Sequence, residues 1–251
     1  MTKEQLREAL MVEQFPMSYK YDPIWMCENE MGPSSVWLTE FLTQEMELKP
    51  GMRVLDMGCG KAMSSIFLAK EFGVQVWAND LWISPTDNWK RIQETGVEDV
   101  VFPIQAEAHS LPYAEEFFDA IVSLDSYHYY GTDEMYFLHF IKLLKRNGQI
   151  GIVVPGLLKE FEAGVPESLK EHWDSEWYTF HSPEWWKNHW GKTGLVEIEV
   201  ADSLSDGWAL WMKWETTLMA SGFMKRGGDI EMLTADNGMH LGFTRVVARR
   251  K

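Results

Sequence analysis

Four acidic residues, Asp56, Asp80, Glu107 and Asp125, each follow a short apolar run of the chain. Apolar runs of this length are typical of buried strands, and the carboxyl ends of parallel strands meet at one edge of a sheet. A single such acid is ordinarily a turn or helix-cap carboxylate, but four at one edge favour a ligand site. Asp80 then suits the two hydroxyls of a ribose, Glu107 an adenine amino group and Asp56 a cationic amine.

The first of these acids lies inside Met52–Ala62, a stretch whose pattern predicts a strand that turns sharply into a helix at Ser64. Gly58 and Gly60 lack a Cβ atom, so the turn can adopt positive φ angles and allow a ligand to approach the backbone. The following helix would aim unpaired N–H groups at that ligand. The Gly-x-Gly signal alone is weak, and its value depends on the acids that follow.

A second set of reactive side chains, Ser126-Tyr127-His128-Tyr129-Tyr130, comes directly after the fourth apolar run. His128 is a candidate general base, which a hydroxyl nucleophile would need, and the tyrosines of this segment, Tyr127 first among them, are candidates for binding a ligand. The alternative for His128 is an ordinary hydrogen bond in the wall of the pocket. No histidine has the spacing of a metal ligand, so no metal site is predicted.

Strands and helices alternate at regular spacing through the first 155 residues. The first predicted strand follows Met52. Four more occupy Val74–Ala78, Val100–Gln105, Ala120–Leu124 and Gln149–Val154, and two further strands occupy Val196–Val200 and Leu241–Arg249. Predicted helices between and before them occupy Ser34–Met46, Ser64–Phe72, Pro85–Thr95 and Glu134–Leu144. This alternation predicts an α/β fold with a doubly wound, mostly parallel, seven-stranded Rossmann-like sheet and helices on both faces.

The chain is expected to form a single domain over residues 1–251, with three parts. Residues 1–47 contain a predicted helix, Thr2–Gln14, and the irregular stretch Phe15–Pro33, which is either a lid or a strap packed across the domain. Residues 48–155 form the core. Residues 156–251 interrupt the regular alternation with helical insertions, predicted at Gly156–Trp173, from Ser182 to Trp190, at Trp208–Ala220 and within Ser221–Asn237.

Charge and composition exclude several classes of partner. The formal net charge is -15, so the surface repels phosphate backbones and anionic membranes, and neither nucleic acid nor a membrane is an expected partner. No apolar run approaches the roughly 20 residues of a membrane span. The two cysteines are far apart and favour a reducing cytoplasm. A monomer or a homodimer is expected.

Tryptophan is abundant, with 13 in the chain. They include the adjacent pair Trp185–Trp186 and the set Trp208, Trp211 and Trp214, whose helical spacing is most often found in a core. Alternatively these rings wall an acceptor pocket. Aromatic faces in acidic surroundings would then suit an amine or another cationic acceptor.

Several motifs between Gly51 and Val154 resemble those of the class I S-adenosylmethionine-dependent methyltransferases. The similarity is to their small-molecule branch, the ubiquinone-biosynthesis-like and cyclopropane-synthase-like group. Val-Leu-Asp-Met-Gly-Cys-Gly matches the glycine turn of that family, and Glu-Ala-His-Ser-Leu-Pro-Tyr, from Glu107, matches its acid-Ala-x-x-Leu-Pro-Phe element. Phe-Asp-Ala-Ile-Val and Leu-Lys-Arg-Asn-Gly match later elements. No single motif is specific, but the combination is.

The resemblance implies a cofactor, S-adenosyl-L-methionine, and roles for individual residues. The segment with Asp56, Gly58, Cys59 and Gly60 would hold its methionine portion. Asp80 would bind the ribose, with Leu81 and Trp82 against the adenine. Glu107 would lie near the adenine amine and the Ala108 N–H near a ring nitrogen. The complete set of candidate cofactor residues is Asp56, Gly58, Cys59, Gly60, Asp80, Leu81, Trp82, Ala106, Glu107, Ala108 and Asp125.

The expected function is methyl transfer to a nitrogen, oxygen or sulfur of a small molecule, mainly by positioning donor and acceptor in line. A nicotinamide-dependent oxidoreductase is disfavoured because Met63 stands where the third glycine of a dinucleotide site belongs. A non-catalytic protein or one that binds a modified S-adenosylmethionine remains an alternative, as does a cyclopropane-forming lipid enzyme. Lys61 and Ala62 depart from the family pattern. Lys61 is expected to point away from the sulfonium or to pair with an acid.

Overall fold

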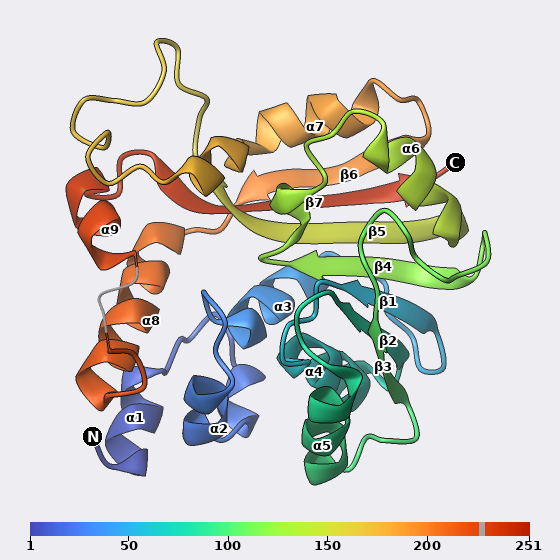
Figure 1. Ribbon diagram of the computed structural model, residues 1–251, viewed down its shortest axis with the longest axis horizontal. Helices are drawn as coiled ribbons and strands as arrows, with labels where there is room; N and C mark the ends of the chain where they lie inside the picture. The colour runs from blue at the N-terminus through green and yellow to red at the C-terminus, as the bar shows by residue number, and fades with distance from the viewer. Residues whose placement is uncertain (226–228) are drawn as a thin grey trace.

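The computed structural model describes residues 1–225 and 229–251 (Figure 1). Seven strands form one sheet in the order β3-β2-β1-β4-β5-β7-β6. All neighbouring pairs are parallel except those made by β7, which runs antiparallel to β5 and β6. The strands are β1 (Arg53–Met57), β2 (Gln75–Asp80), β3 (Val101–Gln105), β4 (Phe118–Leu124), β5 (Leu144–Leu157), β6 (Val196–Ser203) and β7 (Leu241–Arg250). The predicted mostly parallel seven-stranded sheet is confirmed.

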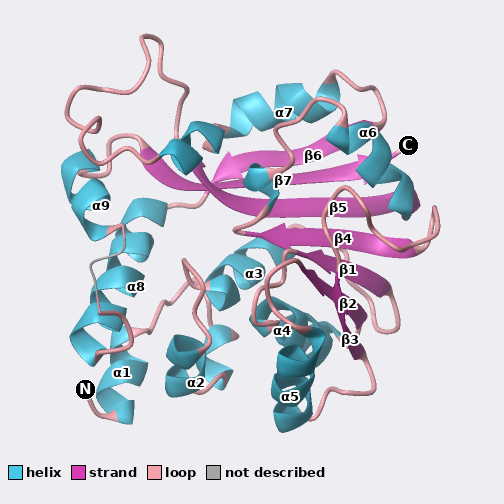
Figure 2. Cartoon of the chain, in the orientation of Figure 1, coloured by secondary structure: helices cyan, strands magenta, loops and turns pink. Residues whose placement is uncertain are grey.

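Helices cover both faces of this sheet (Figures 1 and 2). The α-helices are α1 (Lys3–Ala9), α2 (Pro23–Glu28), α3 (Ser35–Thr43), α4 (Met63–Phe72), α5 (Pro85–Thr95), α6 (Tyr136–Phe140), α7 (Pro183–Gly191), α8 (Gly207–Ser221) and α9 (Ile230–Asp236). Short 3-10 helices occupy Ser18–Lys20, Tyr127–Tyr129, Ile141–Leu143 and Ser175–Thr179. Among the described residues, no helix is long and apolar enough to cross a membrane.

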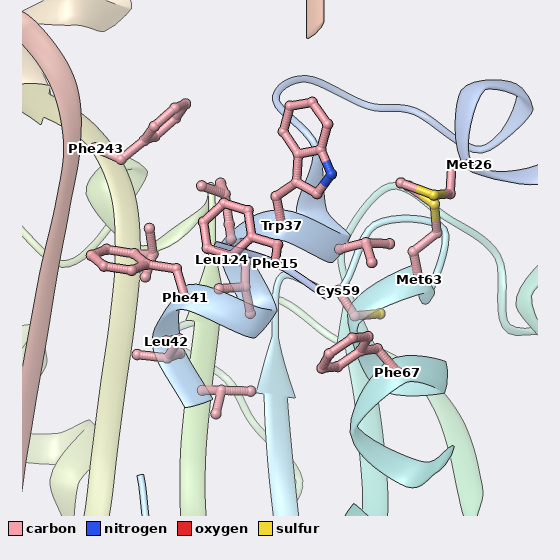
Figure 3. Packing of buried hydrophobic residues seen from close by; sticks show 14 of the residues in the cluster. Phe15, Met26, Trp37, Phe41, Leu42, Cys59, Met63, Phe67, Leu124 and Phe243 are labelled. Atoms are coloured by element: carbon pink, nitrogen blue, oxygen red, sulfur yellow. The ribbon is translucent and has the colours of Figure 1, made fainter. Parts of the chain in front are cut away.

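The two faces of the sheet have separate apolar cores because successive strand residues point to opposite sides. Val54 of β1 belongs to the core beneath α3 and α4, whereas its neighbour Leu55 belongs to the core beneath α6 and α7. Figure 3 shows the first core, where Phe41 and Leu42 of α3 and Phe67 of α4 pack among the strands. This packing fixes the start of α4, and therefore the glycine turn that precedes it.

Most of the clustered tryptophans are core residues. Trp186, Trp190, Trp211 and Trp214 are among the largest fully buried side chains. None of them lines the main cavity of the molecule. Among the described residues, Trp82 is the tryptophan that lines it. These four tryptophans therefore do not wall the main cavity.

The C-terminal third differs from its prediction at one insertion. The predicted helix Gly156–Trp173 is absent from the structure, where these residues finish β5 and then form turns and bends, in the long loop at the upper left of Figure 2. Gly164 and Pro166 interrupt this stretch, and both disfavour a helix interior. Helices α7, α8 and α9 agree with their predictions, while residues 226–228 of the predicted helix and turn lie outside the described residues.

The predicted irregular stretch Phe15–Pro33 contains a 3-10 turn and helix α2, and its last residues form a strap beside the glycine turn. We use "strap" for residues 29–34. Lys61 Nζ donates to the carbonyls of Glu28 and Glu30, at 3.3 and 3.0 Å. Trp214 Nε1 of α8 donates to the carbonyl of Gly32 at 2.9 Å. The strap is thus held from both sides, by Trp214 of α8 and by Lys61 through the carbonyl of Glu30.

Candidate active site

The main cavity of the described chain has a volume of about 330 Å³ and lies at the carboxyl edge of β1, β2 and β4. This volume is within the usual range for small-molecule sites. The residues that line the cavity come mainly from the strap and from the segments that follow the strands. They are Asn29, Met31, Pro33, Ser35, Met57, Gly58, Cys59, Gly60, Lys61, Met63, Ser64, Asp80, Leu81, Trp82, Glu107, Ala108, His109, Leu124, Asp125, Ser126, Tyr129 and Tyr130. Most candidate cofactor residues are in this set.

The glycine turn has the left-handed backbone that its sequence predicted. Gly58 has a φ of 75° and Gly60 a φ of 51°. The Gly58 and Cys59 N–H groups donate to the carbonyl of Asn79 at 2.8 and 3.0 Å, which ties the turn to β2. A Cβ atom on Gly58 would lie 1.9 Å from Ser126 Oγ, so glycine is needed there for space as well as for φ.

Asp56 does not line the cavity, contrary to the expectation that it faces a cationic amine there. Its carboxylate is fully buried beneath the turn, where the hydroxyls of Ser64 and Ser65 both donate to Oδ2 at 2.6 Å. Oδ1 has no hydrogen-bond partner among the described residues. Asp56 therefore fastens the turn to the first residues of α4. Burial raises its pKa to about 6, even though the two serine hydroxyls favour the charged form.

This raised pKa predicts a pH-dependent stability. Between the ordinary value of 3.8 and about 6, folded Asp56 holds a proton that the unfolded chain has released. The contribution of Asp56 to the free energy of unfolding is therefore complete below pH 3.8 and is lost as the pH rises through 6. The loss amounts to about 2–3 kcal/mol. We expect Asp56→Asn to remove this fall, measured by urea unfolding at pH 4, 5, 6 and 7. Identical pH slopes in both proteins would contradict the assignment.

Asp87→Asn is the matched control for that experiment. Asp87 is an exposed residue in the first turn of α5, and a hydrogen bond with Ser84 lowers its pKa. A lowered pKa gives the opposite sign, because that contribution is lost as the pH falls. The control is therefore expected to keep the wild-type decrease in stability between pH 4 and pH 6.

Asp80 lines the cavity and also closes the loop around it. Its Oδ1 accepts the N–H groups of Trp82 and Ile83 at 2.8 and 2.9 Å, and its Oδ2 accepts the Gly60 N–H at 2.8 Å. A carboxylate oxygen has two acceptor positions, so Oδ2 keeps one for a ligand hydroxyl. The sequence predicted a ligand-binding acid here but not its three bonds to the backbone.

The other predicted adenine-side residues have mixed positions. Leu81 and Trp82 line the cavity and are 51% and 72% exposed, so both have surface free to contact a planar ligand. Glu107 and Ala108 also line the cavity, with Glu107 bonded to the backbone and ring nitrogens of His109 at 2.9 and 2.7 Å. Ala106 does not line it, because its N–H and carbonyl bond to Asp80 and Asn79.

Asp125 also lines the cavity, follows β4 and has a φ of 50°. Aspartate tolerates this left-handed conformation better than most residues. Burial, together with the nearby charges of Asp229 and Glu215, raises the pKa of Asp125 well above its usual range. Tyr129 and Tyr130 line the same cavity, and the ring of Tyr129 lies edge-to-face with that of Trp82, with the ring centroids 6.5 Å apart.

The two candidate catalytic residues do not lie where the sequence suggested. Tyr127 is fully buried among aromatic rings that include Trp186 and Trp190, and His128 is only 1% exposed. Neither lines the cavity. Burial lowers the pKa of His128 to about 3, so the imidazole is neutral and a weak base. The 3-10 turn Tyr127–Tyr129 points these side chains inward and leaves Tyr129 facing outward.

Tyr130, one of the tyrosines that the sequence offered as ligand-binding candidates, lines the cavity. Its hydroxyl lies 3.2 Å from Ser123 Oγ and 3.3 Å from Ser126 Oγ. The same hydroxyl is 3.6 Å from the position that a Cβ atom of Gly58 would occupy. Tyr130 therefore lies against the glycine turn, and the Ser126–Tyr130 pattern was the available signal. The described residues contain no group of three or more His, Cys, Asp or Glu side chains arranged to hold a metal ion.

Residues 54–148 match the family model described as a methyltransferase domain. The chain is 26% identical over 169 residues to methyltransferase GfsG from Streptomyces halstedii, covering 66% of this chain and 60% of that protein. It is 24% identical over 181 residues to a glycine/sarcosine/dimethylglycine N-methyltransferase from Actinopolyspora halophila, covering 70% of this chain and 31% of that protein. The match thus spans less than two thirds of either relative.

The fold is also similar to that of the [4+2]-cyclase SpnF, with a TM-score of 0.68, 19% sequence identity, and coverage of 88% of this chain and 83% of the cyclase. The matched methyltransferase domain begins in β1 and ends inside β5. It therefore contains the glycine turn, Asp80 and the acid that ends β4. The residues that form the site thus match a methyltransferase domain, and the chain is similar to the class I S-adenosylmethionine-dependent methyltransferases.

Proposed function

We propose that this protein transfers the methyl group of S-adenosyl-L-methionine to a small-molecule acceptor. The observation that carries the proposal is one cavity that is lined by Asp80 and Trp82, by the glycine turn, and by Asp125 and Tyr129. Asp80 supplies the carboxylate, and Leu81 and Trp82 supply the exposed apolar side chains, that an adenosine needs.

Within this cavity we assign the cofactor to Gly58, Cys59, Gly60 and Asp80. The free acceptor position on Asp80 Oδ2 suits a ribose hydroxyl, and the missing Cβ atoms of the glycines allow the methionine portion to lie against the backbone. Leu81, Trp82 and Ala108 would surround the adenine, with Glu107 at its edge. Asp56 and Ala106 support these contacts without touching the ligand.

The bound cofactor supplies an electrophilic methyl group on a sulfonium. The chain supplies position, since holding two reactants in line provides much of the rate of such a displacement. The strap covers this position with Met31, whose sulfur would lie 3.1 Å from a Cβ on Gly60. His128 is buried and does not line the cavity, which supports another group as the base for any acceptor that has to lose a proton.

Two alternatives make different predictions. The first is a protein that binds S-adenosylmethionine, or a modified form of it, without methyl transfer; the similar fold of a [4+2]-cyclase illustrates that this fold also hosts a reaction other than methyl transfer. A nicotinamide-dependent oxidoreductase is less consistent with the turn, because Met63 stands in place of the third glycine and lines the cavity.

The test is to measure binding and turnover separately. Isothermal titration with S-adenosylhomocysteine and NADH should give binding for the first and none for the second. Incubation with methyl-labelled S-adenosylmethionine and a panel of amines, phenols and thiols should then label at least one acceptor. Binding without labelling of any acceptor would favour the non-methylating alternative, and NADH binding would favour the oxidoreductase.

We further propose that residues 1–251 act as one domain, in the cytoplasm, as a monomer or homodimer. The support for one domain is that α1, α3 and α8 share a core with the central strands. The support for a reducing compartment is that Cys27 and Cys59 are both buried and free. Sedimentation of the purified chain would settle the oligomeric state.

A further inference from the structure

Three hydroxyl groups connect the cavity to the backbone of β1. Ser126 and Tyr130 both line the cavity, whereas Ser123 is buried within β4. Ser126 Oγ lies 3.3 Å from the Tyr130 hydroxyl oxygen, which lies 3.2 Å from Ser123 Oγ. Ser123 Oγ in turn donates to the carbonyl oxygen of Met57 at 2.7 Å. We call these three groups the hydroxyl chain.

The partners of the hydroxyl chain fix the direction of each proton. A carbonyl oxygen can only accept, so the single proton of Ser123 is directed to Met57. Tyr130 is therefore the donor toward Ser123, and the other acceptor within its reach is the same Met57 carbonyl at 3.4 Å. Because Tyr130 uses its proton in either case, Ser126 is the donor in the contact between Ser126 and Tyr130. All three protons are thus directed along the chain toward β1.

The end of the hydroxyl chain that lines the cavity therefore offers lone pairs and no proton. No described residue donates a hydrogen bond to Ser126 Oγ, so its two lone pairs are free for a ligand. The place of these oxygens is beside the glycine turn. A Cβ atom on Gly58 would lie 1.9 Å from Ser126 Oγ and 3.6 Å from the Tyr130 hydroxyl oxygen.

The surroundings of the Tyr130 hydroxyl are negative. Burial raises its pKa above the ordinary range, and the charges of Asp56 and Asp80 raise it further, although the bonds to two serines act in the opposite direction. The hydroxyl is therefore neutral, and the two carboxylates favour a positive charge next to it. A neutral hydroxyl is a weak nucleophile, so this oxygen can lie against an electrophilic methyl group without being methylated itself.

Neutral oxygens of this kind suit a sulfonium better than an ammonium. An ammonium has three N–H donors and pairs most strongly with carboxylates. A sulfonium has no such donor, and its positive charge extends to the neighbouring C–H groups, which form weak hydrogen bonds with neutral oxygens.

We propose that the oxygens of Ser126 and Tyr130 contact the sulfonium of S-adenosyl-L-methionine and so favour the charged methyl donor over its neutral product. This inference rests on the proposed methyl transfer, and it adds the residues that distinguish the donor from S-adenosylhomocysteine. The preference helps the product to leave, because the sulfur carries no charge after the transfer.

The experiment compares two ligands in the wild type and in Tyr130→Phe. Isothermal titration without an acceptor gives the affinities for S-adenosylmethionine and for S-adenosylhomocysteine. Phenylalanine keeps the ring contacts to Tyr127 and Tyr136, whose centroids lie 5.4 and 5.1 Å away, and it lacks only the oxygen. Its absence also frees the Ser126 proton to turn toward the cation.

In Tyr130→Phe we expect the affinity for S-adenosylmethionine relative to S-adenosylhomocysteine to fall about tenfold. The affinity for S-adenosylhomocysteine itself should stay within about threefold of the wild type. Ser126→Ala removes one oxygen contact and frees no proton, so it should lower the same ratio by about threefold.

Tyr21→Phe is the matched control. Tyr21 is also buried, and its hydroxyl donates to Glu71 at 3.3 Å, but it does not line the cavity. This variant loses a hydroxyl from the interior and should keep the wild-type ratio. Equal losses of affinity for both ligands in Tyr130→Phe would mean that Tyr130 only shapes the site, and this result would overturn the inference.

A third ligand separates the sulfonium from the ammonium of the cofactor. The deaminated analogue of S-adenosylhomocysteine lacks only the amino group. If Tyr130→Phe weakens S-adenosylhomocysteine about tenfold but leaves this analogue unchanged, the oxygen holds the ammonium and the inference is wrong. An unchanged ratio with both main ligands bound overturns this inference alone, whereas failure of the wild type to bind either of them overturns the proposed function.

Discussion

Replacing Gly58 with alanine is expected to lower the affinity for S-adenosylhomocysteine by about a hundredfold or more. The new Cβ atom would lie 1.9 Å from Ser126 Oγ and 2.4 Å from Ser126 Cβ, so the turn or the loop after β4 has to move. Both segments line the cavity, and a displacement of either changes the surface against which the cofactor lies. A hundredfold loss corresponds to about 2.7 kcal/mol. Isothermal titration measures it.

Gly96→Ala is the matched control for this substitution. Gly96 ends α5 with a φ of 69°, close to the 75° of Gly58, but a Cβ atom there meets nothing within 4 Å. Both variants therefore carry the same backbone strain, of about 1 kcal/mol. Only Gly58→Ala carries the clash, so Gly96→Ala should bind normally.

A second substitution tests the cause of the clash. In Gly58→Ala with Ser126→Gly, the Oγ and Cβ atoms that obstruct the new methyl group are gone, and the next atom is the Tyr130 hydroxyl at 3.6 Å. This pair should recover most of the lost affinity. Wild-type affinity in Gly58→Ala alone, or failure of the pair to recover with a normal melting curve, would refute the steric explanation.

The sequence was most informative where function depends on local backbone. Gly58 and Gly60 predicted a left-handed turn because few other residues adopt one, and Asp80 follows its strand directly, so its edge position was readable from the alternation of elements. The sheet and its helices followed from the same periodicity. Even there, the antiparallel seventh strand makes β5 longer than predicted, since nine residues of β5 from Gln149 to Leu157 pair with β7.

Side-chain direction was less predictable. Asp56 and Asp80 both come at strand ends, yet Asp56 turns beneath the glycine turn to Ser64 and Ser65 and Asp80 turns toward the cavity. Within the loop after β4, a 3-10 turn buries Tyr127 and His128 and leaves Tyr129 and Tyr130 for the site. A shift of one residue around such a turn would exchange the buried side chains for those that line the cavity. The periodicity of the sequence alone does not determine which side chains are buried.

Long-range placement was beyond sequence reasoning altogether. The tryptophans of α8 suggested either core packing or an acceptor pocket. The structure instead shows Trp214 donating to the carbonyl of Gly32 in the strap, and nothing in the local pattern of either segment encodes that contact. The stretch Phe15–Pro33 was predicted as a lid or a strap, and its anchors on Lys61 and α8 were not predicted because they are tertiary.

Asp80→Asn is expected to weaken S-adenosylhomocysteine binding by at least a hundredfold, through two effects. Both oxygens of Asp80 accept backbone N–H groups, from Gly60 on one side and from Trp82 and Ile83 on the other. An asparagine has one oxygen, so its NH₂ group must face N–H donors on one of these sides. The loop that carries Trp82, or the glycine turn, then loses its fastening, and the acceptor proposed for the ribose is lost with it.

The size of the effect follows from the number of bonds. A hydrogen bond to a charged group contributes about 1.5–3 kcal/mol, so losing one backbone bond and the ribose bond exceeds the 2.7 kcal/mol of a hundredfold change. Asp87→Asn, on the surface of α5 a few residues away, keeps the cavity intact and should bind as the wild type does. Binding of S-adenosylhomocysteine by Asp80→Asn within threefold of wild type, with an unchanged melting temperature, would show that the ribose is held elsewhere. Asp56→Asn is a useful comparison, because Asp56 fastens the other side of the turn but is not proposed to touch the ligand. Asp80→Asn should therefore reduce the affinity for S-adenosylhomocysteine far more than Asp56→Asn does.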